Sequence, residues 1–498
     1  MKKSTLLSTA KLFMYLASIL LFIYGIAFRE LKALDGAIMA CWIGNILFGA
    51  GKPKDRGFFL ALQVTFFAFL MGRTVSDFFM PGKSAYSIPD DVLHHTKVCL
   101  YIALSSLGLS YTLFEKIKFV SRKSDPYKTL QAQSNKNAVD PDEKYNSKFY
   151  ITVRNIAKYL SYFTFIFAAL LVISKAGQIF MYGYANSYLE TSTNLPYLIV
   201  KLGEAYPVCF FLFLATMPSK KEVKIPVLLY LLNGILSLGT GKRSDFVVPI
   251  LIILLYYLVR NQVNSGGSPW LTKKMMIVIG IATPFLLAFL FSWNYIRLGL
   301  GSGSSYAVTE QTSFFEKLIG FFDELGFSSN IISFGKMYEP QIPNKLYSIG
   351  ETLDYLRENI VTQAIVKLPV YRGQTVERAL NSTNFSQLIT YLRSSSYYLS
   401  GRGLGSSYIA EAYHDFGYFG IVLWSWIYSA VLYFGYNFKN KGIIYITISL
   451  CALKYILIAP RNVASGFLTI WINLDIWLVV GLIYLIAKYL RVKKVVIT

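Results

Sequence analysis

A series of long apolar runs is the feature that most constrains how this chain can fold. A bilayer core about 30 Å thick is crossed by a helix of about 20 apolar residues, because each residue rises about 1.5 Å. Runs of this kind recur along the sequence and predict an all-α polytopic membrane protein with about 12 transmembrane helices. The predicted spans are residues 12–28, 31–50, 57–76, 92–114, 156–174, 195–217, 225–239, 244–260, 274–293, 416–438, 442–459 and 466–488.

The composition agrees with this reading. Of the 498 residues, 54% are hydrophobic and only 15% are charged, whereas soluble domains carry about 25% charged residues. These values exclude a disordered chain, a coiled coil and an ordinary cytosolic enzyme. A formal net charge of +22 would suggest nucleic-acid binding in a soluble protein. In a membrane protein the same excess is typical of Lys and Arg held in cytoplasmic loops.

The distribution of the basic residues gives the orientation. One set of loops holds 28 Lys and Arg residues, and the short loops on the opposite side hold eight. The first set is therefore expected to be cytoplasmic, with both termini inside, so no nucleic-acid partner is expected. The first apolar run lacks a small-residue cleavage site and is interpreted as an uncleaved span. All four cysteines fall inside predicted spans, which argues against a disulfide framework or a Cys-rich metal site.

A long loop between the ninth and tenth spans is predicted to form an extracytoplasmic cap. The expected division is 1–293 for the first nine spans, including a cytoplasmic loop at 115–150, then 294–415 for the cap and 416–498 for the last three spans. Apolar spacing predicts helices in the cap near 314–325, 351–368 and 384–392. A spacer loop without a cap is the alternative, but the length and the apolar faces favour a mostly helical cap.

A charge at mid-bilayer costs roughly 2.5–3.5 kcal/mol, so ionisable residues inside predicted spans are candidates for a polar site, and seven of them are singled out. They are Asp35, Lys97, Lys201, Glu204, Asp245, Lys454 and Asp475. The predicted topology places them all in the outer half of a span or near its middle, which favours a polar cavity open to the outside. Lys201 and Glu204 could pair along one helix, and Lys454 and Asp475 could pair across adjacent spans. Structural ion pairs that fix helix packing are the alternative.

Basic residues also gather at the predicted outer ends of the helices. Lys242 and Arg243 lie in a glycine-flanked turn followed by Asp245. Further arginines are predicted to lie outside: Arg297, Arg393, Arg402 and Arg461, with Arg372 and Arg378 also in the long loop. Arginine presents a planar fork of donors that matches phosphate. These residues therefore predict a site for a lipid-linked phosphate or diphosphate. An interfacial anchor is the alternative for any single arginine.

A dense polar motif joins the cap to the tenth span. It reads SGRGLGSSYIAEAYHDFGYFG from Ser400 to Gly420. Glu411 and His414 are three residues apart, and Glu411 and Asp415 are four apart, so the three can share one helix face. Histidine is the side chain best suited to carry a proton near neutral pH. Glu411 and His414 are accordingly the candidates for a catalytic base, with Tyr413, Asp415, Asp245, Lys201 and Glu204 as supporting polar residues.

This motif resembles that of the Wzy-type O-antigen and capsule repeat-unit polymerases, with the pattern G-x-G-x-S-x-x-x-E-x-Y-x-x-x-G-x-x-G opening a late span. The Gly-Lys-Arg-Ser turn and the layout of spans and outer loop are similar as well. An Arg followed eleven residues later by Gly marks some members, but Arg393 reaches Gly403 one residue short, so that motif is not transferred. The resemblance implies a membrane glycosyltransferase that joins polyprenyl-diphosphate-linked oligosaccharides at the outer face of the bacterial plasma membrane.

The resemblance also implies the partners. They are the lipid-linked oligosaccharide, membrane lipid and, as a candidate, a chain-length regulator protein. No cofactor or metal is expected, because no Asp-x-Asp pair occurs on the predicted outer loops. Two other functions remain open, an O-antigen-ligase-like transferase and a lipid-linked oligosaccharide flippase. The absence of an internal sequence repeat and the outward bias of the charges count against the flippase.

Overall fold

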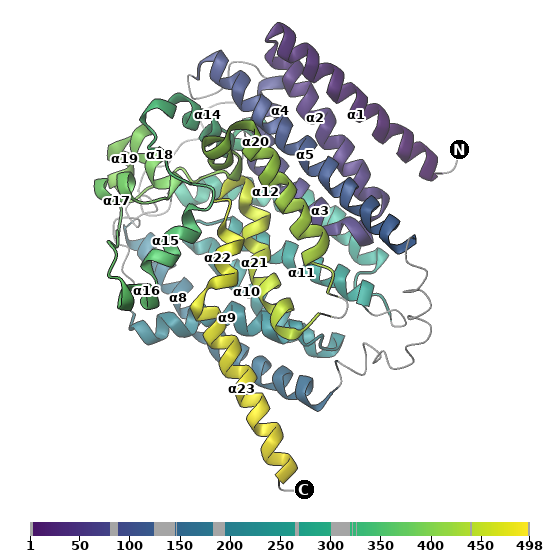
Figure 1. Cartoon of the computed structure of the whole chain (residues 1–498). Helices are drawn as coiled ribbons and strands as arrows, with labels where there is room; N and C mark the ends of the chain where they lie inside the picture. Colours follow the sequence, from purple (N-terminus) through teal and green to yellow (C-terminus); the bar gives the residue numbers. More distant parts are fainter. Residues whose placement is uncertain are drawn as a thin grey trace. The chain divides into compact units, whose positions relative to one another are not determined.

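The computed structural model describes residues 3–79, 88–123, 145, 147–182, 195–263, 268–299, 319–320, 322–324, 326–438 and 441–496. Every regular element among these residues is a helix, which confirms the predicted all-α class (Figure 1). The chain forms two compact units. Unit 1 comprises Met1–Val120, Thr309–Tyr436 and Tyr455–Thr469, and unit 2 comprises Ser121–Val308, Asn437–Lys454 and Ile470–Thr498. The two units are defined by which residues pack together. The predicted division into a transmembrane bundle and an extracytoplasmic cap concerns the side of the membrane and stays a prediction.

Ten helices of the described residues are long and apolar enough to cross a membrane, or eleven if one bent pair is a single span. The bent pair is Gly466–Ile472 with Leu474–Leu490, inclined by 43°. The expected count of 12 is therefore not confirmed. The difference lies in the predicted ninth span, which coincides with the helix α12 (Lys273–Gly299). Within α12 only the stretch Lys274–Thr283 is an apolar helix, and it is too short to be a candidate span. Several side chains in the second half of α12 lie outside the described residues.

Unit 1 is built on the first spans of the chain. Its helices in this region are α1 (Lys3–Phe28), α2 (Leu31–Gly51), α3 (Pro53–Phe66), the π-helical turn η1 (Phe67–Met71), α4 (Gly72–Phe79) and α5 (Asp90–Lys123). α1 lies along α2 (Figure 1) and leaves Leu20 and Phe28 about two-thirds exposed, at 68% and 70%. Such apolar surface is stable when lipid covers it. α5 continues to Lys123, so its last residues fall within the predicted cytoplasmic loop 115–150, whose placement stays a prediction.

A buried asparagine links the first spans through polar contacts. The amide nitrogen of Asn45 donates to the carbonyl of Leu104 at 3.0 Å, and its oxygen accepts from Tyr15 at 2.9 Å. Its amide also donates to Gln63 at 3.3 Å. Interhelical hydrogen bonds of this kind hold membrane helices together where the hydrophobic effect between them is weak. Gly108 faces the Asn45 side chain at the contact, where a Cβ atom would lie 2.3 Å from its oxygen.

The predicted cap supplies the short helices of unit 1. They are η4 (Gly326–Ser328), α14 (Ser329–Met337), η5 (Glu339–Gln341), α15 (Gly350–Glu358), α16 (Ile360–Ile365), α17 (Val376–Asn381), α18 (Phe385–Arg393) and α19 (Ser395–Leu399). The helix predicted at 384–392 is confirmed by α18. The single helix predicted at 351–368 is wrong, because extended Asn359 ends α15 and caps α16 by accepting from the amides of Val361 and Thr362. The helix predicted near 314–325 lies mostly outside the described residues.

Unit 1 is completed by α20 (Tyr408–Ala430), the π-helical turn η6 (Val431–Gly435) and η7 (Ala459–Arg461). Two further helices, α21 (Ile443–Ile458) and α22 (Gly466–Ile472), contribute residues to both units. The hydroxyl of Tyr428 in α20 donates to the carbonyl of Ala464 at 2.7 Å. This bond fixes α20 to the segment that connects α21 with α22.

Unit 2 consists mainly of long apolar helices. They are α8 (Lys148–Tyr182), α9 (Tyr197–Ala215), α10 (Lys220–Ser237), η3 (Leu238–Thr240), α11 (Ser244–Val263), α12 and α23 (Leu474–Val496). α10 begins with a capping box, in which the Glu222 carboxylate accepts from the backbone amide and the hydroxyl of Ser219. α8 packs against α9, α10 and α23. The orientation of the termini across the membrane stays a prediction.

Candidate functional site

The polar motif at 400–420 forms the start of α20 and the loop before it. Ser407 caps the helix in an extended conformation, and the helix is interrupted at Phe416 and Gly417. Gly417 has φ +60°, a left-handed conformation that favours glycine. This interruption coincides with the predicted start of the tenth span at residue 416. The residues Tyr408 to Asp415 therefore form a separate helical segment before this break, within the candidate span Tyr408–Gly435.

Glu411 lies in the interior of unit 1 with both carboxylate oxygens occupied. Its Oε1 accepts from the hydroxyl of Ser406 at 2.6 Å, and its Oε2 accepts from the backbone amide of Ala464 at 2.8 Å. The side chain has no exposed surface. Two donors compensate for the burial of this polar group. Glu411 therefore joins the loop before α20 to the segment between α21 and α22.

The neighbours of Glu411 face a different segment. The Asp415 carboxylate accepts from the backbone amides of Tyr347 and Ser348 at 2.9 and 2.8 Å. The ring of His414 packs against the rings of Tyr347 and Phe385, with centroids 5.1 and 6.1 Å apart. The structure thus brings His414 and Asp415 together at Tyr347. Glu411, expected on the same helix face, turns to other partners.

Tyr413 has a third set of neighbours. Its ring lies 4.3 Å from that of His95 and 5.1 Å from that of Tyr418. The hydroxyl of Tyr418 also lies 3.0 Å from Nδ1 of His95. Tyr413 therefore packs against α5, on the side of α20 where an aromatic cluster forms.

Three of the predicted phosphate-binding arginines belong to unit 1 and lie over aromatic rings. The guanidinium carbon of Arg393 is 5.3 Å from the Phe334 ring centroid, and that of Arg461 is 5.9 Å from Phe69. The elements that carry these side chains and rings form a connected set, because α14 contacts α18 and η1, and η1 contacts η7. Gly405 belongs to the same set, since a Cβ there would lie 3.6 Å from the Arg461 carbonyl.

Among these three arginines, Arg402 has a buried nitrogen that donates no hydrogen bond to any described residue. Its guanidinium carbon lies 5.5 Å from the Tyr397 ring centroid, and its Nε is buried without a hydrogen-bond acceptor. Within the described part of the chain, neither Arg393 nor Arg402 forms an ion pair. Nε of Arg357 is also buried without an acceptor among the described residues, but its Nη2 pairs with Asp354 at 2.7 Å, so the charge of Arg357 is neutralised inside the protein. Arg393 and Arg402 can therefore accept an anion that the protein itself does not supply.

The basic turn of unit 2 follows the expected geometry. η3 ends at Gly241, whose φ of +72° reverses the chain before α11 begins at Ser244. Lys242 is exposed and Arg243 is half-buried. The side chain of Arg297, near the end of α12, lies outside the described residues. The structure therefore holds Lys242 and Arg243 in one tight turn and leaves the placement of Arg297 open.

The seven ionisable residues of the predicted spans form ion pairs with one another. This agrees with the alternative interpretation, in which such pairs fix the packing of the helices. Lys201 pairs with Glu204 at 3.1 Å, as predicted, and with Asp475 at 2.8 Å. The predicted pair of Lys454 with Asp475 is wrong, because Lys454 pairs with Asp245 at the start of α11, at 2.9 Å. The remaining two of the seven residues, Asp35 and Lys97, also pair with each other. None of the seven charges is isolated, which is how a membrane protein tolerates them.

One acidic residue of the cap was missed by the sequence reasoning. Glu351 lies in the first turn of α15, with Oε2 buried and without a hydrogen-bond partner. Burial, reinforced by the carboxylate of Asp354, raises the pKa of Glu351 to about 7. Its Oε2 lies close to Gly466, 3.1 Å from where a Cβ would stand. Only the tertiary packing of α15 against the start of α22 reveals this group, since the sequence shows an ordinary helix-start glutamate.

These observations define a polytopic helical membrane protein in which, among the described residues, Arg393 and Arg402 form no ion pair. The family model described as O-antigen polysaccharide polymerase Wzy matches residues 10–494, nearly the whole chain. The chain therefore belongs to the Wzy family of O-antigen polysaccharide polymerases, which confirms the resemblance seen in its sequence. It is a multi-pass inner-membrane protein with a role in polysaccharide polymerisation. Comparison with curated proteins and with solved structures gave no match.

Proposed function

We propose that this protein polymerises polyprenyl-diphosphate-linked oligosaccharide units at the outer face of the inner membrane. In this reaction a hydroxyl oxygen of one unit attacks the anomeric carbon of the sugar attached to the diphosphate. The bond between that carbon and the diphosphate oxygen breaks, and polyprenyl diphosphate leaves with the electron pair. The hydroxyl proton passes to a base. Membership of the Wzy family supports the polymerase class, and the arginines described above support the diphosphate chemistry.

The observation that carries the proposal is the buried, unpartnered Nε of Arg402. A buried donor without an acceptor costs roughly 1–3 kcal/mol, so a binding partner that supplies one is favoured. A diphosphate supplies such acceptors, and its charge matches the guanidinium. Arg393 and Arg461, which belong to the same unit as Arg402, are proposed as further diphosphate-binding residues. The role of Lys242, Arg243 and Arg297, which belong to unit 2, stays a prediction from the sequence. Fixed cations of this kind stabilise the negative charge that develops on the leaving group without a metal.

Glu411 and His414 are the proposed alternatives for the base that accepts the hydroxyl proton. Both lie in the helical segment before the membrane part of α20, where Asp415 fixes the segment to the backbone at Tyr347 and Ser348. A base role for Glu411 requires that it exchange its bond to Ser406 or to Ala464 for one to the substrate. His414 is half-buried and needs only a movement of its ring.

Tyr413, Asp415, Asp245, Lys201 and Glu204 are proposed as supporting residues. Asp415 positions the segment that carries both base candidates. Asp245 holds the start of α11, next to the basic turn, through its ion pair with Lys454. Lys201 and Glu204 form one network with Asp475. A chain-length regulator is a proposed partner protein.

Deletion of the gene, with the surface glycan analysed by length on a gel, tests the proposed function. The proposal predicts that the glycan shortens to a single repeat unit and that reintroduction of the wild-type gene restores the ladder. Full-length chains that fail to be attached would instead identify a ligase. Lipid-linked units that accumulate on the cytoplasmic side would identify a flippase, and either of these results would refute the polymerase proposal.

A further inference from the structure

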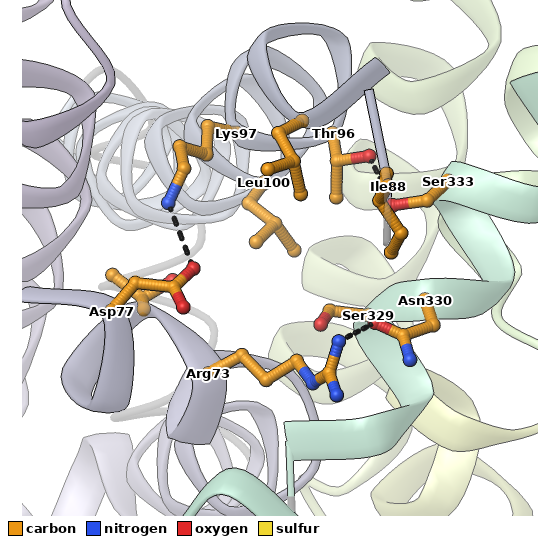
Figure 2. Close-up of a pocket in the computed structure, with 11 residues that line it drawn as sticks. Arg73, Asp77, Ile88, Thr96, Lys97, Leu100, Ser329, Asn330 and Ser333 are labelled. Carbon is orange, nitrogen blue, oxygen red and sulfur yellow. Dashed lines mark hydrogen bonds and ion pairs between the residues drawn. The ribbon is translucent and has the colours of Figure 1, made fainter. Parts of the chain in front are cut away.

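Unit 1 contains a cavity, lined by both apolar and polar side chains, that the proposed chemistry does not use. Its volume is about 50 Å³, room for a few water molecules or for two hydroxyl groups of a ligand. Figure 2 shows its lining side chains around an open centre. The polar ones come from the end of α4, the start of α5 and the cap helix α14, and include Arg73, Asp77, Lys97, Ser329, Asn330 and Ser333.

The charges around this cavity are balanced within the protein. Arg73 and Lys97 are buried, with 7% and 5% of their surface exposed. Nε of Arg73 lies 3.5 Å from the Asp323 carboxylate, and Lys97 pairs with Asp35 and, at 3.4 Å, with Asp77. Two cations thus face three carboxylates. A phosphate or diphosphate in this cavity would meet uncompensated negative charge, so a neutral polar ligand is favoured.

Two lining groups keep hydrogen-bonding capacity for such a ligand. Asn330 accepts from Arg73 through Oδ1, while its buried Nδ2 has no partner. Among the described residues, the only hydrogen-bond partner of the Asp77 carboxylate is Lys97, at the long distance of 3.4 Å, and 29% of the Asp77 side chain is exposed. One group therefore offers a donor and the other an acceptor. A sugar hydroxyl both donates and accepts a hydrogen bond, so a pair of hydroxyls on one sugar ring suits both groups.

The surrounding structure holds these groups in place. Asn330 and Ser333 both lie on α14, which is fixed to α5 by the contact of Ser333 with Thr96 at 2.8 Å. The backbones of α4 and η4 also lie close together, since a Cβ on Gly72 would lie 2.7 Å from the amide nitrogen of Gly326. Recognition groups on rigid helices discriminate between ligands more sharply than groups on loops.

We propose that this cavity is a subsite for a pair of neutral sugar hydroxyls of the oligosaccharide, and that it contributes to the choice of the sugar. The assignment rests on the proposed function, because the lipid-linked oligosaccharide is the substrate that presents such hydroxyls. The predicted topology places the loop between α4 and α5 on the same outer side as the cap. The ring bound here belongs either to the incoming unit or to the growing chain, which share this chemistry.

A binding experiment tests the subsite. The probe is the repeat-unit oligosaccharide released by mild acid from its lipid, free of phosphate, titrated into full-length protein in nanodiscs. Asp77→Asn replaces one acceptor oxygen of the carboxylate with a donor, and Asn330→Ala removes the amide donor; each change should raise the Kd about tenfold or more. Leu100→Phe fills the cavity while leaving the polar groups in place, and it should weaken binding too. Glu339→Gln, an exposed carboxylate just after α14, is the matched control and should leave the Kd unchanged.

Two results would overturn the subsite. The first is an unchanged Kd in all three cavity variants, each with a melting temperature near that of the wild type. The second is displacement of the oligosaccharide by inorganic phosphate, which would identify an anion site.

The subsite and the proposed function can fail separately. If gene deletion leaves the polymer intact while binding still depends on Asp77, the polymerase proposal falls and the subsite stands. If polymer requires the gene while binding ignores all three cavity variants, the subsite alone falls. In the polymerisation reaction the Asp77→Asn variant should raise KM with little change in kcat, which a merely destabilised protein would not do.

Discussion

The hydroxyls of Thr96 in α5 and Ser333 in α14 lie 2.8 Å apart in the interior of unit 1, although 237 positions separate them in the chain. A membrane-spanning helix and a helix of the predicted cap are thus joined by a buried polar contact. The nearby bond from Arg73 to Asn330 makes a second such link. The described part of the cap is therefore built into unit 1, where it can position side chains for chemistry.

The close approach of α4 to η4 should depend on glycine. A Cβ on Gly72 would lie 1.9 Å from the Phe322 carbonyl oxygen, so Gly72→Ala must push the two segments apart. Overpacking of this kind costs typically about 1–3 kcal/mol. The melting temperature in detergent should fall by several degrees. Gly481→Ala, where nothing lies within 4 Å, is the control and should not lower it. Equal melting temperatures for both variants would contradict the packing described.

The buried carboxyl of Glu351 should make stability depend on pH. Its pKa is raised from the ordinary 4.5 to about 7, so between these values the folded protein holds a proton that the unfolded chain has lost. Stability should therefore fall as pH rises through this window and level off above pH 7. Glu351→Gln should flatten the dependence of the melting temperature on pH between about 4.5 and 7.

The control for this measurement is Glu377→Gln, because Glu377 is an exposed carboxylate of the same cap. Its pH profile should match that of the wild type. If Glu351→Gln keeps the full wild-type slope, another group carries the pH dependence and the burial of Glu351 is not its cause.

The two base candidates can be separated by substitution. Glu411→Gln keeps the shape of the side chain but puts an amide donor next to Ser406 or to the Ala464 amide, and His414→Ala removes the imidazole. Loss of the true base should lower the rate of polymer formation by about 10²-fold or more. The measurement is the initial rate with purified protein whose melting temperature is checked in parallel. A variant with full activity removes its residue from the mechanism.

Metal removal gives a fourth prediction. Because fixed guanidinium groups stabilise the leaving diphosphate in the proposed mechanism, EDTA should leave the rate of a purified polymerisation reaction unchanged. The assay compares initial rates with and without the chelator. A rate that collapses in EDTA and returns with added Mg²⁺ or Mn²⁺ would require a metal in place of arginine alone.

Local signals predicted much of this fold. The apolar runs located the helices, and the spacing in 384–392 predicted α18, which runs from Phe385 to Arg393 and is capped by Asn384. The break between α15 and α16 was not predicted, because the apolar spacing continues across Asn359 and only the observed cap reveals the stop. The Lys454 partner was also missed. The predicted depth in the membrane made Asp475 and Asp245 equally suitable as the ion-pair partner of Lys454. The packing of the helices brings Asp245 into contact with Lys454.

The candidate site was predictable only in part. Residue type indicated arginines for a phosphate, but which arginines are neutralised internally depends on tertiary contacts, as Arg357 and Arg402 illustrate. The motif at 400–420 predicted a common face for Glu411 and Asp415. The structure gives them different partners, since one turns to Ala464 and the other to Tyr347. Burial of Glu351 and the cavity beside Asn330 arise from contacts between distant segments, which spacing within one helix cannot encode.

The most direct test of the central claim is the polymerisation rate of purified Arg402→Ala with a defined lipid-linked oligosaccharide, followed as a ladder on a gel. We predict a loss of about 10²-fold or more in kcat, partial recovery in Arg402→Lys, and wild-type activity in Arg372→Ala, an exposed cap arginine that serves as control. A wild-type ladder from Arg402→Ala would contradict the claim that this guanidinium stabilises the departing diphosphate.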